Sequence, residues 1–317
     1  MTRVKTAVLF LAGIAAGCGG GGGGGAGQGG WRSYATPPGT LGISALWASA
    51  PNDVWASGQT LLHFDGTSFT AVTDAPIVAA ADFWGFAPDD LYAVSGPNLA
   101  HWDGTAWTLI DFAGAIDPSG LTAVWGTSGG DLWLGDELNG QVFHWDGAAW
   151  SSGITQTVSV TDLWGAPGTG GGAVYAGGIF GLARWSEAAW TDIGDDVAME
   201  AASLWGFADD DVWVVSDFGT LAHWDGSGWT DTLPADNADF QDGLTSIWGA
   251  APNDVWAVGD FGAISHWDGA QWTQIAYGKF PYYPFLSKVH GSSADDVWIA
   301  GRSANGSSAA VVLHKEP

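Results

Sequence analysis

Histidines and aspartates are the residues of this 317-residue chain whose spacing could support metal binding or proton transfer. Six of the seven histidines recur about 41 residues apart, at one position of a repeat. A shared metal ion needs ligands that converge to about 2 Å from it. One histidine per structural unit does not converge in this way, so we predict no metal site, no cofactor and no catalytic residue. Each histidine is instead expected to hydrogen-bond within its own unit, to the turn aspartate two residues further on. The six are His63, His101, His144, His223, His266 and His314.

Aspartates also recur just before one strand of the repeat, where we expect them to accept hydrogen bonds from turn amides. Calcium binding is the alternative, but the acidic segment 231–242 lacks the compact alternating spacing of a calcium loop. Acidic loops such as 192–196 keep a carboxylate mechanism open. The repeated aspartates are Asp53, Asp211, Asp254 and Asp296.

One segment, 276–288, departs from the repeat and holds the candidate ligand-binding residues. It contains five aromatic residues and two lysines in thirteen positions. Such a segment could form a stacking platform for a sugar or a peptide; alternatively, it folds down and closes the rim with its rings buried. The predicted ligand-binding residues are Tyr277, Lys279, Phe280, Tyr282, Tyr283 and Phe285.

The elements that must position these residues are four short strands per repeat. Each element is five to seven residues long, rich in β-branched and aromatic residues, and bounded by Gly, Asp, Asn or Pro, which is the pattern of strands. Asp-Gly between the third and fourth elements predicts a type I′ hairpin turn. In the second element both alternating sets of side chains are apolar, so both faces of the sheet must be buried.

Four antiparallel strands in about 40 residues, repeated and stacked, predict an all-β fold: a seven-bladed β-propeller. The chain ends in a third strand and begins, at Trp31, with an unaccompanied fourth strand. We therefore expect the N-terminal strand to complete the last blade and close the ring. The Leu-Trp-Gly, Asp-Val-Trp and His-Trp-Asp-Gly motifs resemble those of secreted bacterial β-propeller repeat proteins, with a layout similar to kelch and Asp-box propellers. This resemblance implies architecture and not activity.

The 22 tryptophans all fall on repeat positions, which indicates packing between blades rather than a ligand site. His290 occupies the seventh position of the set that is tryptophan in the other six repeats. The connections between blades are the variable part of the sequence. We expect them to share one face of the ring with the turns between second and third strands, and any localised site to use that face and the central opening.

The N-terminus determines the expected compartment. A short basic region precedes an apolar stretch that is too short to span a bilayer, which is typical of a secretory signal. The stretch ends in Ala-Ala-Gly-Cys and resembles the lipobox of bacterial lipoproteins, which implies lipid attachment at Cys18. We expect a signal peptide over 1–17, a lipidated cysteine and glycine-rich tether over 18–30, and the propeller over 31–317. Gly19 follows this cysteine, where an acidic residue often signals inner-membrane retention in the lipoproteins that the segment resembles. The resemblance therefore implies the outer membrane, on its periplasmic side or at the cell surface.

Composition excludes some partners. Without the signal, the chain has six basic residues against 34 acidic ones, a formal charge of −28, which disfavours nucleic acid and anionic lipid. We expect a monomer that meets the membrane only through its lipid anchor. The sequence thus favours a non-catalytic binding or scaffold module for a glycan or protein of the envelope. The alternative is a glycan-cleaving propeller, sialidase-like or carboxylate-dependent. Arg32, Arg184 and Arg302 lie on different repeat positions and are not expected to meet at one substrate carboxylate.

Overall fold

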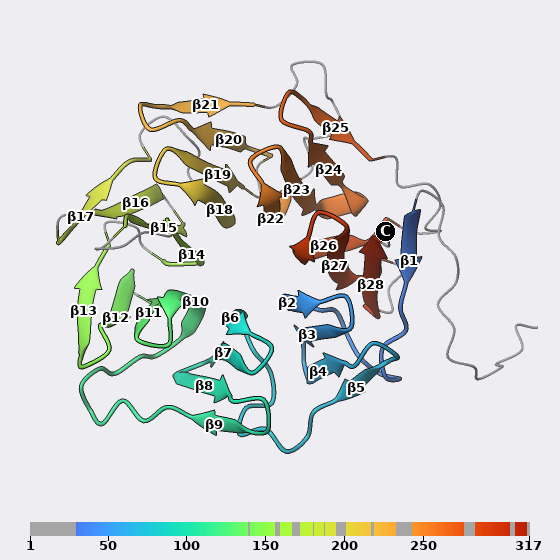
Figure 1. Cartoon of the computed structure of the whole chain (residues 1–317), viewed down its shortest axis with the longest axis horizontal. Coiled ribbons are helices and arrows are strands. Elements are labelled where there is room, and N and C mark those ends of the chain that lie inside the picture. Colours follow the sequence, from blue (N-terminus) through green and yellow to red (C-terminus); the bar gives the residue numbers. More distant parts are fainter. Residues whose placement is uncertain are drawn as a thin grey trace, which may run out of the picture.

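A computed structural model describes residues 30–138, 140–155, 159–166, 172–179, 181–186, 188–194, 201–216, 219–232, 243–275, 283–304 and 308–315. Its strands form seven four-stranded antiparallel sheets arranged around a central axis (Figure 1). The predicted seven-bladed β-propeller is confirmed.

Each blade runs from an inner strand at the axis to an outer strand at the rim. In every blade but the last, the four strands follow one another directly in the sequence. Blade 1 has β2 (Ala45–Ala50), β3 (Asp53–Ser57), β4 (Leu61–Phe64) and β5 (Phe69–Ala71). Blade 2 has β6 (Asp82–Ala87), β7 (Asp90–Ser95), β8 (Asn98–Trp102) and β9 (Trp107–Leu109). Blade 3 has β10 (Leu121–Ser128), β11 (Asp131–Asp136), β12 (Gln141–Trp145) and β13 (Trp150–Ile154). Blade 4 has β14 (Asp162–Gly165), β15 (Val174–Gly178), β16 (Gly181–Ser186) and β17 (Ala189–Asp192). Blade 5 has β18 (Ser203–Ala208), β19 (Asp211–Val215), β20 (Leu221–Trp224) and β21 (Trp229–Asp231). Blade 6 has β22 (Leu244–Ala251), β23 (Asp254–Gly259), β24 (Ile264–Trp267) and β25 (Trp272–Gln274).

The seventh blade closes the ring as the sequence predicts. It contains β26 (Phe285–Ser293), β27 (Asp296–Arg302) and β28 (Ala310–Lys315), and its outer strand is β1 (Trp31–Ser33). Trp31 pairs with Lys315 and Ser33 with Leu313, so the two ends of the chain share one sheet (Figure 1). The contact joins the first and last parts of the fold through backbone hydrogen bonds.

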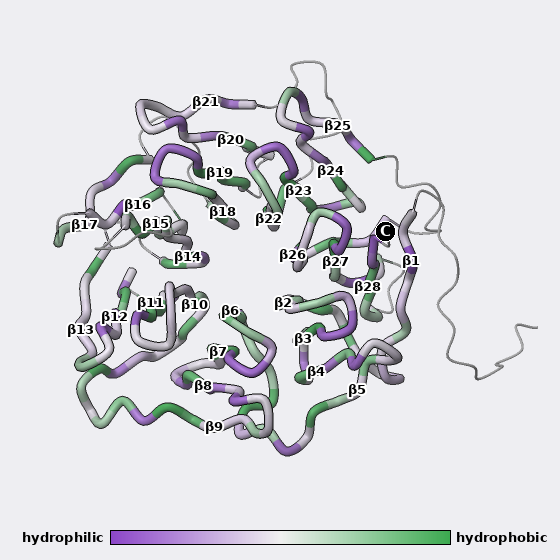
Figure 2. Tube along the Cα trace, in the orientation of Figure 1, coloured by the Kyte–Doolittle hydropathy of each residue, from purple (hydrophilic) through white to green (hydrophobic). Residues whose placement is uncertain are grey.

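The second strand of each blade is buried on both faces because neighbouring blades cover it. In β23, for example, Val255, Ala257 and Val258 are fully buried, and Trp256 is 3% exposed. The strand bodies are largely hydrophobic and the hairpin turns that join inner strands are hydrophilic (Figure 2). This distribution follows from stacking sheets face to face, and it accounts for the continuous apolar pattern of the sequence.

A glycine after the first-strand tryptophan makes room for the neighbouring blade. A Cβ on Gly85 would lie 2.3 Å from the ring of Trp47, and one on Gly165 would lie 2.3 Å from the ring of Trp125. In each repeated Trp-Gly pair, the tryptophan packs on the next blade, and the glycine leaves room for the tryptophan of the preceding blade.

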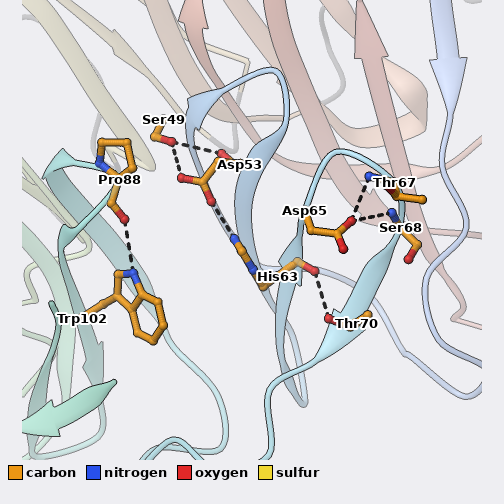
Figure 3. A network of polar contacts seen from close by, with 9 residues as sticks. All are labelled: Ser49, Asp53, His63, Asp65, Thr67, Ser68, Thr70, Pro88 and Trp102. Atoms are coloured by element: carbon orange, nitrogen blue, oxygen red, sulfur yellow. Dashed lines mark hydrogen bonds and ion pairs between the residues drawn. The ribbon is translucent and has the colours of Figure 1, made fainter. Parts of the chain in front are cut away.

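The hairpins between third and fourth strands differ from the predicted type I′ turns. Gly66, Gly104 and Gly147 have φ near +88°, whereas the residues that follow them do not have positive φ. A type I′ turn needs a positive φ at both central residues, so the type I′ prediction is wrong. In blade 1, the Asp65 carboxylate accepts hydrogen bonds from the amides of Thr67 and Ser68 (Figure 3). The Asp65 side chain thus stabilises the turn by accepting hydrogen bonds from amides that do not take part in strand pairing.

Helical structure is almost absent from the described residues. The one named helix among them is the 3-10 turn η3 (Asp260–Gly262) between β23 and β24. Within the ranges that the structure describes, no helix has the length and apolar character that crossing a membrane requires.

Candidate functional site

The repeated histidines form hydrogen-bonded pairs with aspartates inside their own blades. In blade 1, His63 Nε2 lies 2.6 Å from Asp53 Oδ1, and Ser49 donates a hydrogen bond to the other carboxylate oxygen of Asp53 (Figure 3). The ring of Trp55 stacks on His63 at 4.4 Å between centroids. The same pairing joins His101 to Asp90, His144 to Asp131, His223 to Asp211, His266 to Asp254 and His314 to Asp296, at 2.5–2.8 Å.

The predicted partner of these histidines is wrong, although pairing within the blade is confirmed. The turn aspartate two residues on, Asp65 in blade 1, uses its carboxylate on the turn amides. The partner is the aspartate that begins the second strand, which we had expected to bind turn amides. In blade 3, the hydrogen bond from His144 holds the pKa of Asp131 below its usual value. These pairs fasten the second strand to the third and to the first hairpin, and so have a structural role.

Aromatic side chains of the first strands narrow the axis of the ring. Trp84 and Trp205 from opposite sides of the ring lie 6.2 Å apart, and Trp248 lies 5.7 Å from His290 of the adjacent blade. His290 Nδ1 accepts a hydrogen bond of 3.1 Å from the amide of Ala48. A space of about 420 Å³ lies between these rings and the hairpins that follow the first strands, and a smaller space of about 50 Å³ lies beside the residues that precede the rings. The expectation that a localised site uses the central opening stays a prediction.

Three charged side chains line the smaller of these spaces, which we call the axial space: Asp82, Asp162 and Lys288. Each stands two residues before a first-strand aromatic residue, where the other blades have alanine or serine. Lys288 Nζ lies 3.8 Å from Asp82 Oδ1, and their side chains are 23% and 16% exposed. Asp82 accepts a hydrogen bond from the amide of Val124, and Asp162 accepts one from the amide of Leu204. These bonds connect the inner strands of neighbouring blades.

Burial dominates the electrostatics of the axial group. It raises the pKa of Asp82 to about 6, with the charge of Lys288 opposing the rise and that of Asp162 adding to it. Burial also raises the pKa of Asp162. For Lys288, burial acts to lower the pKa, but the two carboxylates outweigh it and the pKa rises. For His290, burial and the neighbouring Lys288 charge lower the pKa to about 3. The histidine is thus neutral, and the lysine is a cation held between two acids.

The prediction that Lys288 belongs to a variable loop is wrong. Phe285 and Lys288 belong to the inner strand β26, with Lys288 paired to Ala300. The axial group was not predicted from the sequence. Its only signal was the presence of charged residues at a repeat position that is otherwise alanine or serine.

An aromatic cluster lies where blades 6 and 7 meet, at the ends of strands on the face that carries the turns between second and third strands. We call it the rim patch; it consists of Phe261, Phe285 and Arg302, with the exposed Tyr283 two residues before Phe285 in the sequence. Phe261 is 50% exposed and Tyr283 is 72% exposed. The ring of Phe285 lies 5.9 Å from that of Phe261, and the guanidinium carbon of Arg302 lies 4.1 Å from the Phe285 centroid. Cation–π contact of this kind holds the arginine against the ring.

Phe261 has an unusual backbone for a bulky residue. Its φ of 53° and ψ of 19° lie in the left-handed region, within η3 between β23 and β24. This conformation costs a non-glycine residue on the order of 1 kcal/mol, and such outliers cluster at binding sites. Phe261 was not among the predicted site residues, because its Asp-Phe-Gly turn resembles an ordinary blade turn in the sequence.

Of the six predicted ligand-binding residues, the structure brings Phe285 into the rim patch and leaves Tyr283 exposed beside it in sequence. Tyr277, Lys279, Phe280 and Tyr282 lie outside the described residues, as does Cys18. Of the acidic loop residues, Asp192 accepts a hydrogen bond from the amide of Gly194. The described ranges contain no group of three or more His, Cys, Asp or Glu side chains that could hold a metal ion.

The three arginines of the propeller region face three different rings. Arg32 lies over Tyr34 at 4.9 Å, Arg184 over Tyr175 at 5.8 Å, and Arg302 over Phe285. In blade 4, Arg184 replaces the repeated histidine, and its Nε donates a hydrogen bond of 3.1 Å to the Tyr175 hydroxyl. Each guanidinium thus has its own aromatic neighbour.

Comparison with known proteins agrees with the fold. No family model matches the chain, and no curated protein matches it. Among solved structures, YCF48 bound to D1 peptide superposes with a TM-score of 0.68 at 19% identity, covering 91% of this chain and 97% of that one. YCF48 from Cyanidioschyzon merolae gives 0.68 at 13% identity, with 90% and 98% covered. The WD40 β-propeller domain of Doa1 gives 0.72 at 11% identity, with 91% and 97% covered. The class defined by fold and comparison is the β-propeller.

Proposed function

We propose that the chain is a non-catalytic binding module that recognises a protein or glycan partner through the rim patch. The observation that carries this proposal is the exposed ring of Phe261 beside the Arg302–Phe285 pair, with Tyr283 exposed two residues before Phe285. Exposed aromatic rings and arginine are the residues that contribute most to recognition surfaces. The likeness to a propeller bound to a peptide supports a protein partner.

The geometry also supports binding over catalysis. The six repeated histidines each pair with an aspartate of their own blade, and the axial carboxylates contact Lys288 and backbone amides. The rim patch offers stacking surfaces and one cation, which suit a ring or a chain that is held without being cleaved. Its location on the variable face agrees with where function resides in folds built from a rigid scaffold and variable loops.

The rim patch is tested by the double substitution Phe261→Ser and Tyr283→Ser in the full-length protein. We expect loss of about 2 kcal/mol or more of binding free energy, or roughly 30-fold in Kd, because exposed aromatic anchors dominate such interfaces. Binding is measured on a glycan array and by capture from native envelope extract, followed by titration of the identified partner.

The matched control is Val78→Ser with Ile154→Ser, two apolar residues that are 74% and 68% exposed on other blades. The control should bind like the wild type. Equal partner binding by the rim-patch variant and the control would reject this site. Binding on the glycan array would identify the partner as a glycan, and capture of a protein from the extract would identify it as a protein.

We further propose that Cys18 carries a lipid and that the following glycine-rich segment tethers the propeller to the cell envelope, at the outer membrane. The support is the run of small residues before a single cysteine, together with the short apolar stretch that precedes it. Fatty-acid labelling in cells should mark the wild-type protein. Cys18→Ser should abolish the label and release the protein from the membrane fraction; a labelled Cys18→Ser protein would contradict the assignment.

A further inference from the structure

Blade interfaces in this propeller follow a packing rule. The second-strand aromatic residue of one blade inserts between the third- and fourth-strand aromatic residues of the next. Trp55 of blade 1, for example, lies 5.1 Å from both Trp102 and Trp107 of blade 2. The same arrangement joins Trp133 to Trp185 and Trp190, Trp213 to Trp267 and Trp272, and Trp298 to Phe64 and Phe69.

The interface between blades 2 and 3 breaks this rule. Tyr92 replaces the second-strand tryptophan, while Trp145 and Trp150 of blade 3 remain. Tyr92 stacks on His101 at 4.4 Å and lies 6.0 Å from Phe86, but among these described side chains no ring contact joins it to Trp145 or Trp150. The phenol is smaller than an indole and makes no ring contact with the two tryptophans of the next blade.

A cavity of about 490 Å³ occupies this interface. Its volume lies in the range of small-molecule sites. We call it the interblade pocket. It is lined mainly by rings and aliphatic side chains, among them Tyr92, Ile110, Phe112, Leu132, Trp145 and Trp150.

The outer wall of the interblade pocket is a structured loop after β9. Phe112 packs edge-on against Trp150 at 5.2 Å. Asp111 accepts a hydrogen bond of 2.8 Å from the amide of Ala113, which has a φ of 51°. A left-handed alanine held by its neighbour's carboxylate indicates a loop fixed in shape rather than one that collapses into the space. Asp111, an exposed acidic residue of this loop, is also among the residues that line the pocket.

The interface of blades 4 and 5 also holds a cavity, of about 540 Å³, but charged side chains line it, among them Arg184 and Asp209. Tyr175 also replaces a tryptophan there, but its hydroxyl donates to the backbone oxygen of Asp209 and accepts from Arg184. Arg184 and Asp209, 3.9 Å apart, make that interface polar. At the interface of blades 2 and 3 the corresponding third-strand residue is His101, which pairs with Asp90. The interblade pocket therefore keeps an apolar, aromatic interior.

We propose that the interblade pocket binds a planar aromatic ring of indole size that carries an amine or N–H donor. The size and shape of the expected ligand follow from the repeat, because the residues equivalent to Trp145 and Trp150 contact an indole at other interfaces. The Asp111 carboxylate, in a chain of net charge −26, defines the polarity by favouring a donor or cation and disfavouring an anion. This site is separate from the rim patch.

The test titrates tryptamine, N-acetyltryptophanamide and indole-3-acetate into the full-length protein, by calorimetry and saturation-transfer NMR. We expect saturable binding of tryptamine and at least 10-fold weaker binding of indole-3-acetate. If N-acetyltryptophanamide equals tryptamine, the pocket takes a side chain of a partner segment; if tryptamine is much tighter, it takes a free aromatic amine. Absence of saturable binding by any of the three overturns the proposal.

Two pairs of variants locate the site. Tyr92→Trp restores the ring found at most other interfaces and narrows the pocket beside Trp145 and Trp150, so it should weaken tryptamine binding, whereas Tyr92→Phe should bind within about 3-fold of wild type because it adds no volume. Ala149→Leu narrows the pocket from the exposed hairpin of blade 3. Its control is Ala106→Leu, at the equivalent hairpin position of blade 2.

The Ala149→Leu pair makes no change in the core, so it remains informative if Tyr92→Trp does not fold. Loss of binding in Ala149→Leu but not in Ala106→Leu supports the proposal. Wild-type affinity for tryptamine in folded Tyr92→Trp, or in Ala149→Leu, overturns it.

Discussion

Lys288→Met is expected to lower the free energy of unfolding by about 3 kcal/mol, because removing one partner of a buried ion pair leaves an uncompensated charge. The lysine is the only cation among the described residues that line the axial space, and it faces Asp82 and Asp162. Without it, two carboxylates with raised pKa values share a space of about 50 Å³. In a chain of this size the expected fall in Tm is on the order of 6–12 °C.

Urea and thermal unfolding at pH 7.5 measure the effect of Lys288→Met. The matched control is Lys315→Met, which removes a half-buried lysine whose Nζ donates to the backbone oxygen of Ala294 and is not paired with a carboxylate among the described residues. That change should cost less than about 1 kcal/mol. The destabilisation by Lys288→Met should also shrink between pH 7.5 and 5, since protonation of Asp82 relieves the uncompensated charge.

A triple variant separates the charge from the packing. The variant combines Asp82→Ser, Asp162→Ser and Lys288→Ser. It reproduces the equivalent positions Ser203 and Ser246, whose hydroxyls accept hydrogen bonds from the amides of Ile247 and Val289. Since replacing an entire buried ionic group is often neutral, we expect the triple variant to recover most of the stability lost in Lys288→Met. Wild-type stability in Lys288→Met, or a triple variant as unstable as the single one, would show that the axial charges do not act as a group.

The repeat explains why the fold was predictable from the sequence. Seven copies place tryptophan, aspartate and glycine at fixed strand positions, and the incomplete repeats at the two ends could be joined in only one sheet. The confirmed pairing of Trp31 with Lys315 follows from this. Local periodicity and composition determine such features, because each strand pairs with its neighbour in sequence everywhere except at the closure.

Choices between chemically similar partners were less predictable. His63 has an aspartate two residues later and another at the start of the preceding strand, and both can accept its hydrogen bond. Pairing of Trp55 with His63 brings Asp53 to the histidine, whereas turn amides occupy Asp65. The sequence contains both candidates, but only the register and the turn type distinguish them.

Contacts across the axis could not be predicted from a repeat. Asp82 in blade 2 meets Lys288 in blade 7, and no sequence spacing indicates which inner strands face one another at that depth. The interblade pocket has a similar origin, because a tyrosine at a tryptophan position reads as a conservative exchange. Only the three-dimensional packing of Trp145 and Trp150 shows that the exchange opens a space.

His290 is expected to make the protein sensitive to acid. Its pKa is about 3 in the folded protein against an ordinary value of 6.5. Between these values the unfolded chain binds more protons than the native one, so the free energy of unfolding falls as the pH falls, by up to about 1.4 kcal/mol per pH unit. Asp82 acts in the opposite sense. Its folded pKa of about 6 exceeds the ordinary 3.8, so its contribution to stability rises as the pH falls from 6.

The substitution His290→Gln distinguishes the pH effect of His290 from that of Asp82. It removes the titration of the imidazole and keeps a hydrogen-bond acceptor for the Ala48 amide. At pH 7.5 the variant should be slightly less stable than the wild type, because it loses ring contacts with Trp47 and Trp248. On going to pH 5.0, which stays above the isoelectric point of about 4.1, the difference should shift by about 2 kcal/mol in favour of the variant. Asp82→Asn should shift the other way. Urea unfolding at four pH values measures both, and a stability difference for His290→Gln that stays constant over this range would mean that the axial histidine is not held neutral by burial.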